Sequence, residues 1–181
     1  MRKLLFTISS FILFCTITSA QTIVLKADGI KGESDKAKYK DKTELMGLVI
    51  EGSSSQSAPA GGGMATGKRT YQPVTILKQT GASSPIFFQN FFIGRFIREV
   101  VIEYYKTDKT AIGITGVLDY SITLKNVIVT GFKQFSGPLK NERFDPVNDN
   151  ILCDEIKFNF QEIILEYKKG SILAQDNTIS R

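Results

Sequence analysis

The sequence predicts a mainly β protein, an antiparallel β-barrel of about six to seven strands with one short α-helix. Short runs rich in β-branched and aromatic residues recur along the chain, and turn residues separate them. One segment alone carries both a start signal and a stop signal for a helix. Two long apolar runs change phase midway, which is typical of strands that bend or contain a β-bulge, as barrels require.

The first 20 residues are expected to form a secretory signal peptide. Met1–Lys3 is basic, the run that follows to Ile17 is largely apolar, and small residues precede a cleavage site between Ala20 and Gln21. The apolar run is shorter than the roughly 20 residues that a membrane-spanning helix needs. We therefore expect a secreted or periplasmic protein without a stable membrane anchor. An uncleaved anchor and a lipoprotein modified at Cys15 are the alternatives.

Composition limits the chemistry of the mature chain. The 181 residues include 23 Lys plus Arg, 18 Asp plus Glu, two Cys and no His. Removal of Arg2 and Lys3 would leave 21 basic and 18 acidic residues, a net charge of +3 instead of +5. Cys153 would remain alone, so no intrachain disulfide could form. The absence of His excludes Ser–His, Cys–His and His–metal mechanisms, and a non-enzymatic role is expected.

Three strands are predicted before the helix. Thr22–Ala27 is the first and ends at Asp28–Gly29, and Glu44–Glu51 is the second. The polar segment between them, with lysines at alternate positions, is interpreted as a solvated loop or an exposed strand face. Tyr71–Gln79 is the third strand, in which Pro73 indicates an edge or a bulge.

A Ser/Gly-rich loop over residues 52–67 separates the second and third strands. It is long for a hairpin connection, so it is expected to be mobile or used for contacts. The overlapping stretch Gly62–Lys68 fits most of a P-loop pattern, but Arg69 occupies the position of the magnesium-binding Ser or Thr. A strand follows where a helix should meet the phosphates, so no nucleotide cofactor is expected.

The helix is predicted to begin at Ser84–Pro85 and to end at Gly94. Ser84 would cap it and Pro85 would occupy its first position. Four phenylalanines then follow at spacings that place them on one face of the helix, and we expect a sheet or barrel to cover that face. They are Phe87, Phe88, Phe91 and Phe92.

The second half of the chain is predicted to be strands and a tail. Ile97–Tyr105 is one strand, and Lys106–Leu118 is a hairpin. Asp119–Phe135 and Glu155–Tyr167 are long strand regions in which the buried positions shift by one residue midway. The barrel domain is therefore predicted over residues 21–169, followed by a flexible tail over 170–181.

The positions of the apolar residues show where each phase shift occurs. In the first of these long regions the apolar positions run through Leu124 and then shift to Val127. In the second they run through Phe160 and then shift to Ile163.

Acidic residues in this half do not form a recognisable site. The acidic loop that includes Asp145, Asp149 and Asp154 departs from an EF-hand because Val147 stands where a second ligand should be. Glu162 and Glu166 are an even number of positions apart, so they could lie on the same face of a strand. Paired carboxylates on one strand without a cleft are weak evidence for a glycosidase. Cys153 has no His to activate it. No catalytic residue, metal site or RNA-reading motif is expected.

The order and spacing of these motifs extend over nearly the whole mature chain. The motif-bearing residues are Asp28–Ser34 (DGIKGES), Tyr71–Gln72 with Lys78, Ser84–Pro85, Gly94, Ile97, Val100, Tyr120, Ile122, Leu124, Asn126–Val127, Glu155, Ile156, Phe160, Ile163 and Tyr167. On these residues the chain resembles the haemolysin-coregulated protein (Hcp) family, which forms the inner tube of the type VI secretion system. The DGIKGES stretch is the most specific of them.

The resemblance implies an Hcp-like barrel with a flanking helix that assembles with copies of itself into hexameric rings. Such rings stack into a tube, with secreted effectors as candidate cargo in the lumen and no nucleic-acid partner. Helix and barrel would face their neighbours in the ring, and extended loops would join ring to ring. The candidate assembly residues are Asp28, Gly29, Lys31, Glu33, Ser53, Gln56, Gly62 and Lys68.

Two features depart from the family pattern. Family members are usually loaded from the cytoplasm without a Sec signal, whereas this chain has the signal-peptide pattern described above. The insert near Asp108–Gly116 and the loop Leu139–Cys153 also look longer than usual. The alternative function is therefore a secreted or periplasmic monomeric binding module that reuses the Hcp-like barrel.

Overall fold

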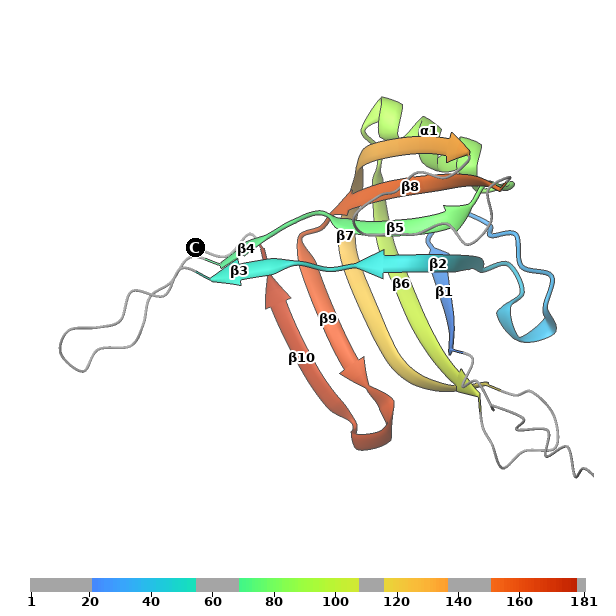
Figure 1. The fold of residues 1–181 in the computed structure, drawn as a ribbon. Coiled ribbons are helices and arrows are strands. Elements are labelled where there is room, and N and C mark those ends of the chain that lie inside the picture. Colours follow the sequence, from blue (N-terminus) through green and yellow to red (C-terminus); the bar gives the residue numbers. More distant parts are fainter. Residues whose placement is uncertain (1–20, 55–68, 108–115, 137–150, 179–181) are drawn as a thin grey trace, which may run out of the picture.

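A six-stranded antiparallel barrel forms the centre of the computed structural model, which describes residues 21–54, 69–107, 116–136 and 151–178 (Figure 1). The sheet has the order β10-β9-β7-β6-β1-β2-β5-β8, and pairing of β7 with β8 closes the barrel. Its strands are β1 (Gln21–Ala27), β2 (Thr43–Val49), β5 (Val74–Gln79), β6 (Phe96–Thr107), β7 (Gly116–Ser136), β8 (Leu152–Asn159), β9 (Glu162–Tyr167) and β10 (Ile172–Asn177).

A second, two-stranded sheet consists of β3 (Gly52–Ser54) and β4 (Arg69–Tyr71). The predicted third strand is therefore divided at Gln72–Pro73, where the chain leaves the small sheet and enters β5. Proline cannot donate a backbone hydrogen bond, and here it marks the break rather than a bulge within one strand. Two short 3₁₀ helices, η1 (Ala37–Tyr39) and η2 (Lys168–Gly170), lie in the connections.

The barrel corner lies at Asn126, where β7 changes partners. The Tyr120–Lys125 part of β7 pairs with β9, and the part that begins at Ile128 pairs with β8. Asn126 has a φ of 50°, and its Nδ2 donates a hydrogen bond of 2.9 Å to Oε1 of Gln161. The predicted phase shift within β7 is thus confirmed, and a residue in the left-handed region produces it.

The second predicted phase shift has a different cause. Glu155–Tyr167 is not one bent strand, because β8 ends at Asn159 and β9 begins at Glu162. The backbone N–H of Gln161, between the two strands, donates to the carbonyl of Lys125 at 3.0 Å. The change in parity therefore marks a break between strands at the same corner.

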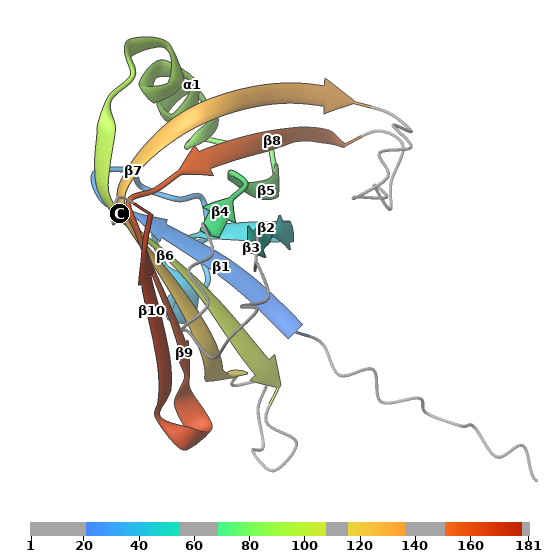
Figure 2. The ribbon, with the colours of Figure 1, turned by 90° about the vertical axis from the view of Figure 1, so that its left-hand side faces the viewer.

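The prediction of a tail from residue 170 is wrong for Ile172–Asn177, which form β10. All six residues pair with β9, from Ile172 with Tyr167 to Asn177 with Glu162. The strand has no alternating pattern because five of its six residues are exposed, so backbone pairing rather than burial defines it. Figures 1 and 2 show the turn between β9 and β10 at one end of the molecule and the helix at the other.

Helix α1 (Ser84–Ile93) has the predicted extent. Gly94 ends it with a φ of 61°, and its N–H donates to the carbonyl of Asn90. The N-terminal cap is shifted by one residue from the prediction, because Ser83 occupies the cap position and Ser84 is the first helical residue. Pro85 fits near this end since the first helical N–H groups lack intrahelical partners.

The barrel interior forms one apolar core of aliphatic and aromatic side chains. It is built from every barrel strand and from the helix. Its fully or almost fully buried members include Leu25, Val74, Ile76, Phe87, Val100, Ile102, Ile122, Leu124, Val127, Ile156 and Phe158.

Candidate functional site

The predicted contact loop, Asp28–Ser34, connects β1 to the segment that precedes β2. It begins with a turn in which the N–H of Ile30 donates to the carbonyl of Ala27 at 3.1 Å. Asp28 pairs with Arg98 of β6 at 2.9 Å, and Lys31 pairs with Asp41 at 3.2 Å. Both lysine and arginine ends are largely exposed, so these surface pairs add little stability and leave the charges accessible to a partner.

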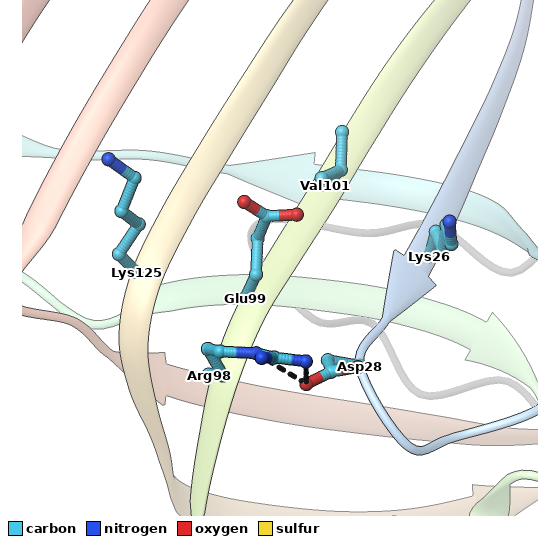
Figure 3. A pocket seen from close by; sticks show the side chains of 6 residues that line it. All are labelled: Lys26, Asp28, Arg98, Glu99, Val101 and Lys125. Atoms are coloured by element: carbon cyan, nitrogen blue, oxygen red, sulfur yellow. Dashed lines mark hydrogen bonds and ion pairs between the residues drawn. The ribbon is translucent and has the colours of Figure 1, made fainter.

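Asp28 also borders a shallow hollow of about 400 Å³ on the outer face of β1 and β6 (Figure 3). Figure 3 shows that cationic and anionic side chains alternate around it. This mixed charge gives the hollow no preference for an anion or a cation. It is lined by Lys26, Asp28, Arg98, Glu99, Val101 and Lys125.

Gly32 holds the contact loop close to the start of β2. Its N–H donates to the carbonyl of Asp41 at 2.9 Å. A Cβ at this position would lie 2.1 Å from the carbonyl carbon of Lys42, far inside van der Waals contact. Only glycine therefore permits this close approach of two backbones.

Glu33 links the contact loop to the start of helix α1. Its Oε1 accepts hydrogen bonds from the N–H of Ser83 at 3.0 Å and from the Ser83 hydroxyl at 2.6 Å. The same oxygen lies 3.0 Å from Nζ of Lys78 in β5. Burial alone would raise the pKa of Glu33, but the hydrogen bonds from Ser83 and Lys78 bring it below its ordinary value of 4.5.

Lys78 is the centre of a buried polar network beneath this loop. Its side chain is fully buried, as is that of Asp154 in β8, and the two charged groups are 3.4 Å apart. Nζ of Lys78 also donates to Oγ of Ser84 at 2.9 Å and to the carbonyl of Gln79 at 2.7 Å. The network thus joins the loop, two barrel strands and the first turn of the helix.

Asp154 is fully satisfied within this network. Its Oδ1 accepts from Oγ1 of Thr80 at 2.7 Å and from Nε2 of Gln134 at 2.9 Å, and its Oδ2 accepts from Ser84. Within the described residues, every buried side-chain nitrogen and oxygen has a hydrogen-bond partner. We assign the network a structural role, because a charge buried with this many partners is held in place rather than presented to a ligand.

The network was not predicted from the sequence. From the sequence, Asp154 is expected in an acidic loop with Asp145 and Asp149, and nothing in its spacing from Lys78 indicates that the two side chains meet. Glu33, Lys78 and Ser84 all belong to the motif-bearing residues of the resemblance, which was the available signal.

The remaining predicted assembly residues lie elsewhere or outside the described structure. Ser53 is exposed in β3, and Figure 1 shows the β3–β4 hairpin and the β1–β2 connection at opposite sides of the barrel. The candidates therefore do not form one continuous site. Gln21 is the first residue of β1. Three predicted assembly residues, Gln56, Gly62 and Lys68, lie outside the described ranges, as does Ala20 of the predicted cleavage site.

The helix exposes most of its aromatic residues, which contradicts the prediction that the sheet would cover them. Ser84, Phe87 and Asn90 form the buried stripe, and Phe88 and Phe92 lie beside it rather than within it. Phe92 is 71% exposed and Phe88 is 45% exposed. Four phenylalanines at i, i+1, i+4 and i+5 span a wider arc than one contact with β7 can bury.

These side chains form a continuous apolar area, here called the aromatic surface. The ring of Phe88 contacts those of Phe92, at 4.9 Å between centroids, and of Phe132 in β7, at 5.2 Å. A hollow of about 490 Å³ lies beside it, lined by Thr80, Gly81, Ser84, Pro85, Phe88, Phe132 and Gln134. Its exposed members on the helix are Phe88, Phe91, Phe92 and Ile93.

Three of the alternating lysines before β2 contact the barrel strands. Lys36 lies 2.7 Å from Glu44, Lys42 pairs with Glu103 of β6, and Lys38 donates to the carbonyl of Gly116. The charges of Lys36 and Lys42 are thus matched by carboxylates, which weakens any positive stripe along this segment.

The described residues contain neither a metal site nor a spanning helix. They hold no group of three or more Cys, Asp or Glu side chains that could bind a metal ion. Among them, no helix has the length and apolar character needed to cross a membrane.

Known proteins share both the sequence pattern of this chain and its closed barrel with a flanking helix. The model of the family described as type VI secretion system effector, Hcp, matches residues 24–167. The chain belongs to the Hcp family. No curated protein matches the sequence significantly.

Solved Hcp structures share the fold at low sequence identity. Hcp1 from E. coli EAEC 042 is similar with 21% identity and a TM-score of 0.66, over 87% of this chain and 97% of that chain. Hcp1 from Salmonella typhimurium is similar with 18% identity and a TM-score of 0.64, over 86% and 92%. The secreted protein Hcp3 from Pseudomonas aeruginosa has 16% identity and a TM-score of 0.60, over 87% and 99%.

Family membership confirms the predicted fold class and the structural role. Hcp proteins are structural tube proteins of the type VI secretion system rather than enzymes, and this chain is a structural protein of that family. The carboxylates Glu162 and Glu166 agree with this role, because Glu162 pairs with Lys125 at 2.9 Å and Glu166 with Lys168 on the surface of the sheet. Both carboxylates are therefore paired with lysines at the surface of the sheet.

Proposed function

We propose that the mature chain assembles with copies of itself into hexameric rings and that these rings stack into a tube. The aromatic surface on helix α1 is the observation that carries the proposal, together with membership of the tube-protein family. A monomer that exposes this many large apolar side chains on one face needs a partner to cover them.

A second copy of this chain is the partner that we propose for the aromatic surface. Helix α1 contains no charged residue, and interface cores are depleted of charge and enriched in aromatic residues. The surface continues from the helix onto Phe132 of β7. A ring requires a heterologous contact, in which this face of one copy packs against a different face of the next.

Ring-to-ring contact is proposed to use two other parts of the chain. One is the contact loop Asp28–Ser34, whose position Glu33 fixes against the helix and β5. The other is the loop that the β3–β4 hairpin carries, with Ser53 on one arm and Lys68 next to the other. Secreted effectors in the lumen are the proposed cargo of such a tube.

We also propose that the first 20 residues direct the chain through the Sec route, with cleavage between Ala20 and Gln21. The mature protein would then act in the periplasm or outside the cell as a barrel of residues 21–169 extended by β10.

The test combines N-terminal sequencing with analysis of assembly. The full chain is expressed in a bacterial host, and the exported form is sequenced and studied by native mass spectrometry and negative-stain microscopy. We expect Gln21 as the first residue and a mass of six subunits. The Phe92→Ser variant should remain folded, because Phe92 is 71% exposed, but should lose the ring.

A matched control is Val117→Ser, which removes an apolar side chain of 55% exposure from the start of β7, away from the helix. It should leave ring formation unchanged. A strict monomer at high protein concentration would contradict the ring and would support a monomeric binding module instead. An intact Met1 in the cytoplasmic fraction would contradict the export route.

A further inference from the structure

The C-terminal strand β10 is joined to the β3–β4 hairpin by a small polar cluster, here called the Asp176 cluster. The hydroxyl of Tyr71 in β4 donates to Oδ2 of Asp176 at 2.6 Å. Nη1 of Arg69, also in β4, lies 3.0 Å from Oδ1 of the same carboxylate. Both carboxylate oxygens are therefore used, and two side chains of one hairpin arm converge on one residue of β10.

The geometry of the Asp176 cluster is tighter than that of an ordinary surface ion pair. The Asp176 side chain is only 18% exposed, whereas the other end of the pair, Arg69, is 64% exposed. The hydrogen bond from Tyr71 lowers the pKa of Asp176 and raises the pKa of Tyr71, so the bond is to the ionised carboxylate. The ring of Tyr71 is fixed as well, since it packs edge-on against Phe160 at 5.6 Å.

Asp176 lies on a strand that cannot shift easily. Six residue pairs join β10 to β9, and β9 in turn pairs with β7 of the barrel. The end of β10 is anchored by Thr178, whose N–H donates to the carbonyl of Gln161 at 2.7 Å and whose hydroxyl donates to the carbonyl of Phe160 at 2.8 Å. The carboxylate is therefore presented from a rigid support.

The hairpin lacks such support from its own pairing. Strands β3 and β4 pair only three residues each and form a sheet separate from the barrel sheet. An isolated two-stranded hairpin is marginally stable in water, so its direction depends on contacts that it makes with the rest of the molecule. Tyr71 and Arg69 supply such contacts at the hairpin base.

We propose that the Asp176 cluster fixes the direction of the β3–β4 hairpin and thereby orients this arm for contact with the next ring. Tyr71, Arg69 and Asp176 are thus positioning residues for ring stacking, and β10 is the support that they use. The link to stacking rests on the proposed assembly into rings, whereas the positioning of the hairpin itself does not.

The first test measures amide hydrogen exchange in the mature protein at the amides that point across the hairpin, which are those of Ser53, Thr70 and Gln72. In Asp176→Ala we expect exchange at these amides to be at least about tenfold faster, because the variant loses one hydrogen bond to a charged group. The urea midpoint should fall by no more than about 0.7 M, which is the equivalent of a tenfold change at an m-value of about 2 kcal/mol per M. Unchanged hairpin exchange would overturn the proposal.

Tyr71→Phe is the second variant, because it keeps the ring against Phe160 and removes only the hydroxyl. It should accelerate the same amides even if Asp176→Ala folds poorly. The double variant should exchange no faster than the faster of the two single variants, because both changes break the same interaction. Asp119→Asn, which breaks the Lys106–Asp119 pair between β6 and β7, is the matched control and should leave the hairpin unchanged.

The second test compares stacking of the same variants by sedimentation and electron microscopy. Asp176→Ala and Tyr71→Phe should form single rings at concentrations where the wild type forms stacks. Normal stacking of both variants would overturn the link to assembly. A wild type that forms no rings would refute the proposed function, while the exchange rates would still decide whether the Asp176 cluster positions the hairpin.

Discussion

Replacing Lys78 with methionine should destabilise the protein more than any exposed substitution on the barrel. Methionine keeps most of the length and volume of the side chain but removes its charge and its donors. The variant would leave the fully buried carboxylate of Asp154 without its cation and would remove one partner from Glu33. The first turn of α1 would also lose the bond from Lys78 to Ser84.

The magnitude follows from what remains around Asp154. Breaking a buried ion pair costs about 3–5 kcal/mol when the other charge is left behind. Asp154 keeps hydrogen bonds from Thr80, Gln134 and Ser84, which places the expected loss near the lower end, about 3 kcal/mol. With an m-value of about 2 kcal/mol per M, the urea midpoint should fall by about 1.5 M.

The assay is equilibrium unfolding in urea at neutral pH, followed by circular dichroism. The double variant Lys78→Met with Asp154→Asn supplies the control, because asparagine retains an acceptor for Thr80 and Gln134 without a charge. It should be more stable than Lys78→Met alone by about 1–2 kcal/mol. A loss below about 1 kcal/mol in Lys78→Met would refute the reasoning, since that is the range of surface substitutions.

Three further predictions concern single residues. The pKa of Glu33 is lower in the folded chain than its ordinary 4.5, so its contribution to stability is complete above pH 4.5 and is lost as the pH falls through the folded pKa. In Glu33→Gln the urea midpoint should therefore depend less on pH between about pH 5 and pH 3 than in the wild type. The same pH dependence in both proteins would contradict this. Asn126→Ala should lower the free energy of unfolding in urea by about 1–2 kcal/mol, because alanine tolerates a φ of 50° poorly. Asn126→Gly should lower it less, and equal losses in the two variants would contradict the conformational explanation. Burial and the neighbouring Asp154 raise the pKa of the Cys153 thiol, so alkylation at pH 8 should be slow in native protein and rapid in urea; fast native labelling would show that the thiol is exposed.

The helix and the barrel corner could be predicted because local residues determine them. Gly94 takes a left-handed conformation that few other residues accept, and Pro85 fits only the first helical turn. The shift of buried positions from Leu124 to Val127 located the corner because burial on the inside of a barrel requires alternation.

The buried network and β10 could not be predicted by the same logic. Alternation places Lys78 on the same face of β5 as Val74 and Ile76, which belong to the barrel core. The other face of the strand is buried as well, because Leu77 packs with Phe135 and Cys153. A lysine at this inward-facing position gives no sign in the sequence of the partners that surround it, which are Glu33, Ser84 and Asp154. In β10 the reverse holds, since the strand exposes Ile172 and Leu173 and owes its structure to backbone bonds that carry no sequence pattern.

The pairing of β1 has a consequence for the order of folding. Its residues pair with Val100–Lys106 along their whole length, and the barrel closes only when β8 pairs with both β5 and β7. Most of the chain must therefore leave the ribosome before the first strand gains its main partner. Such a high contact order predicts slow folding and a long-lived unfolded nascent chain. An export route that accepts only unfolded chains would have time to engage this protein before its barrel closes.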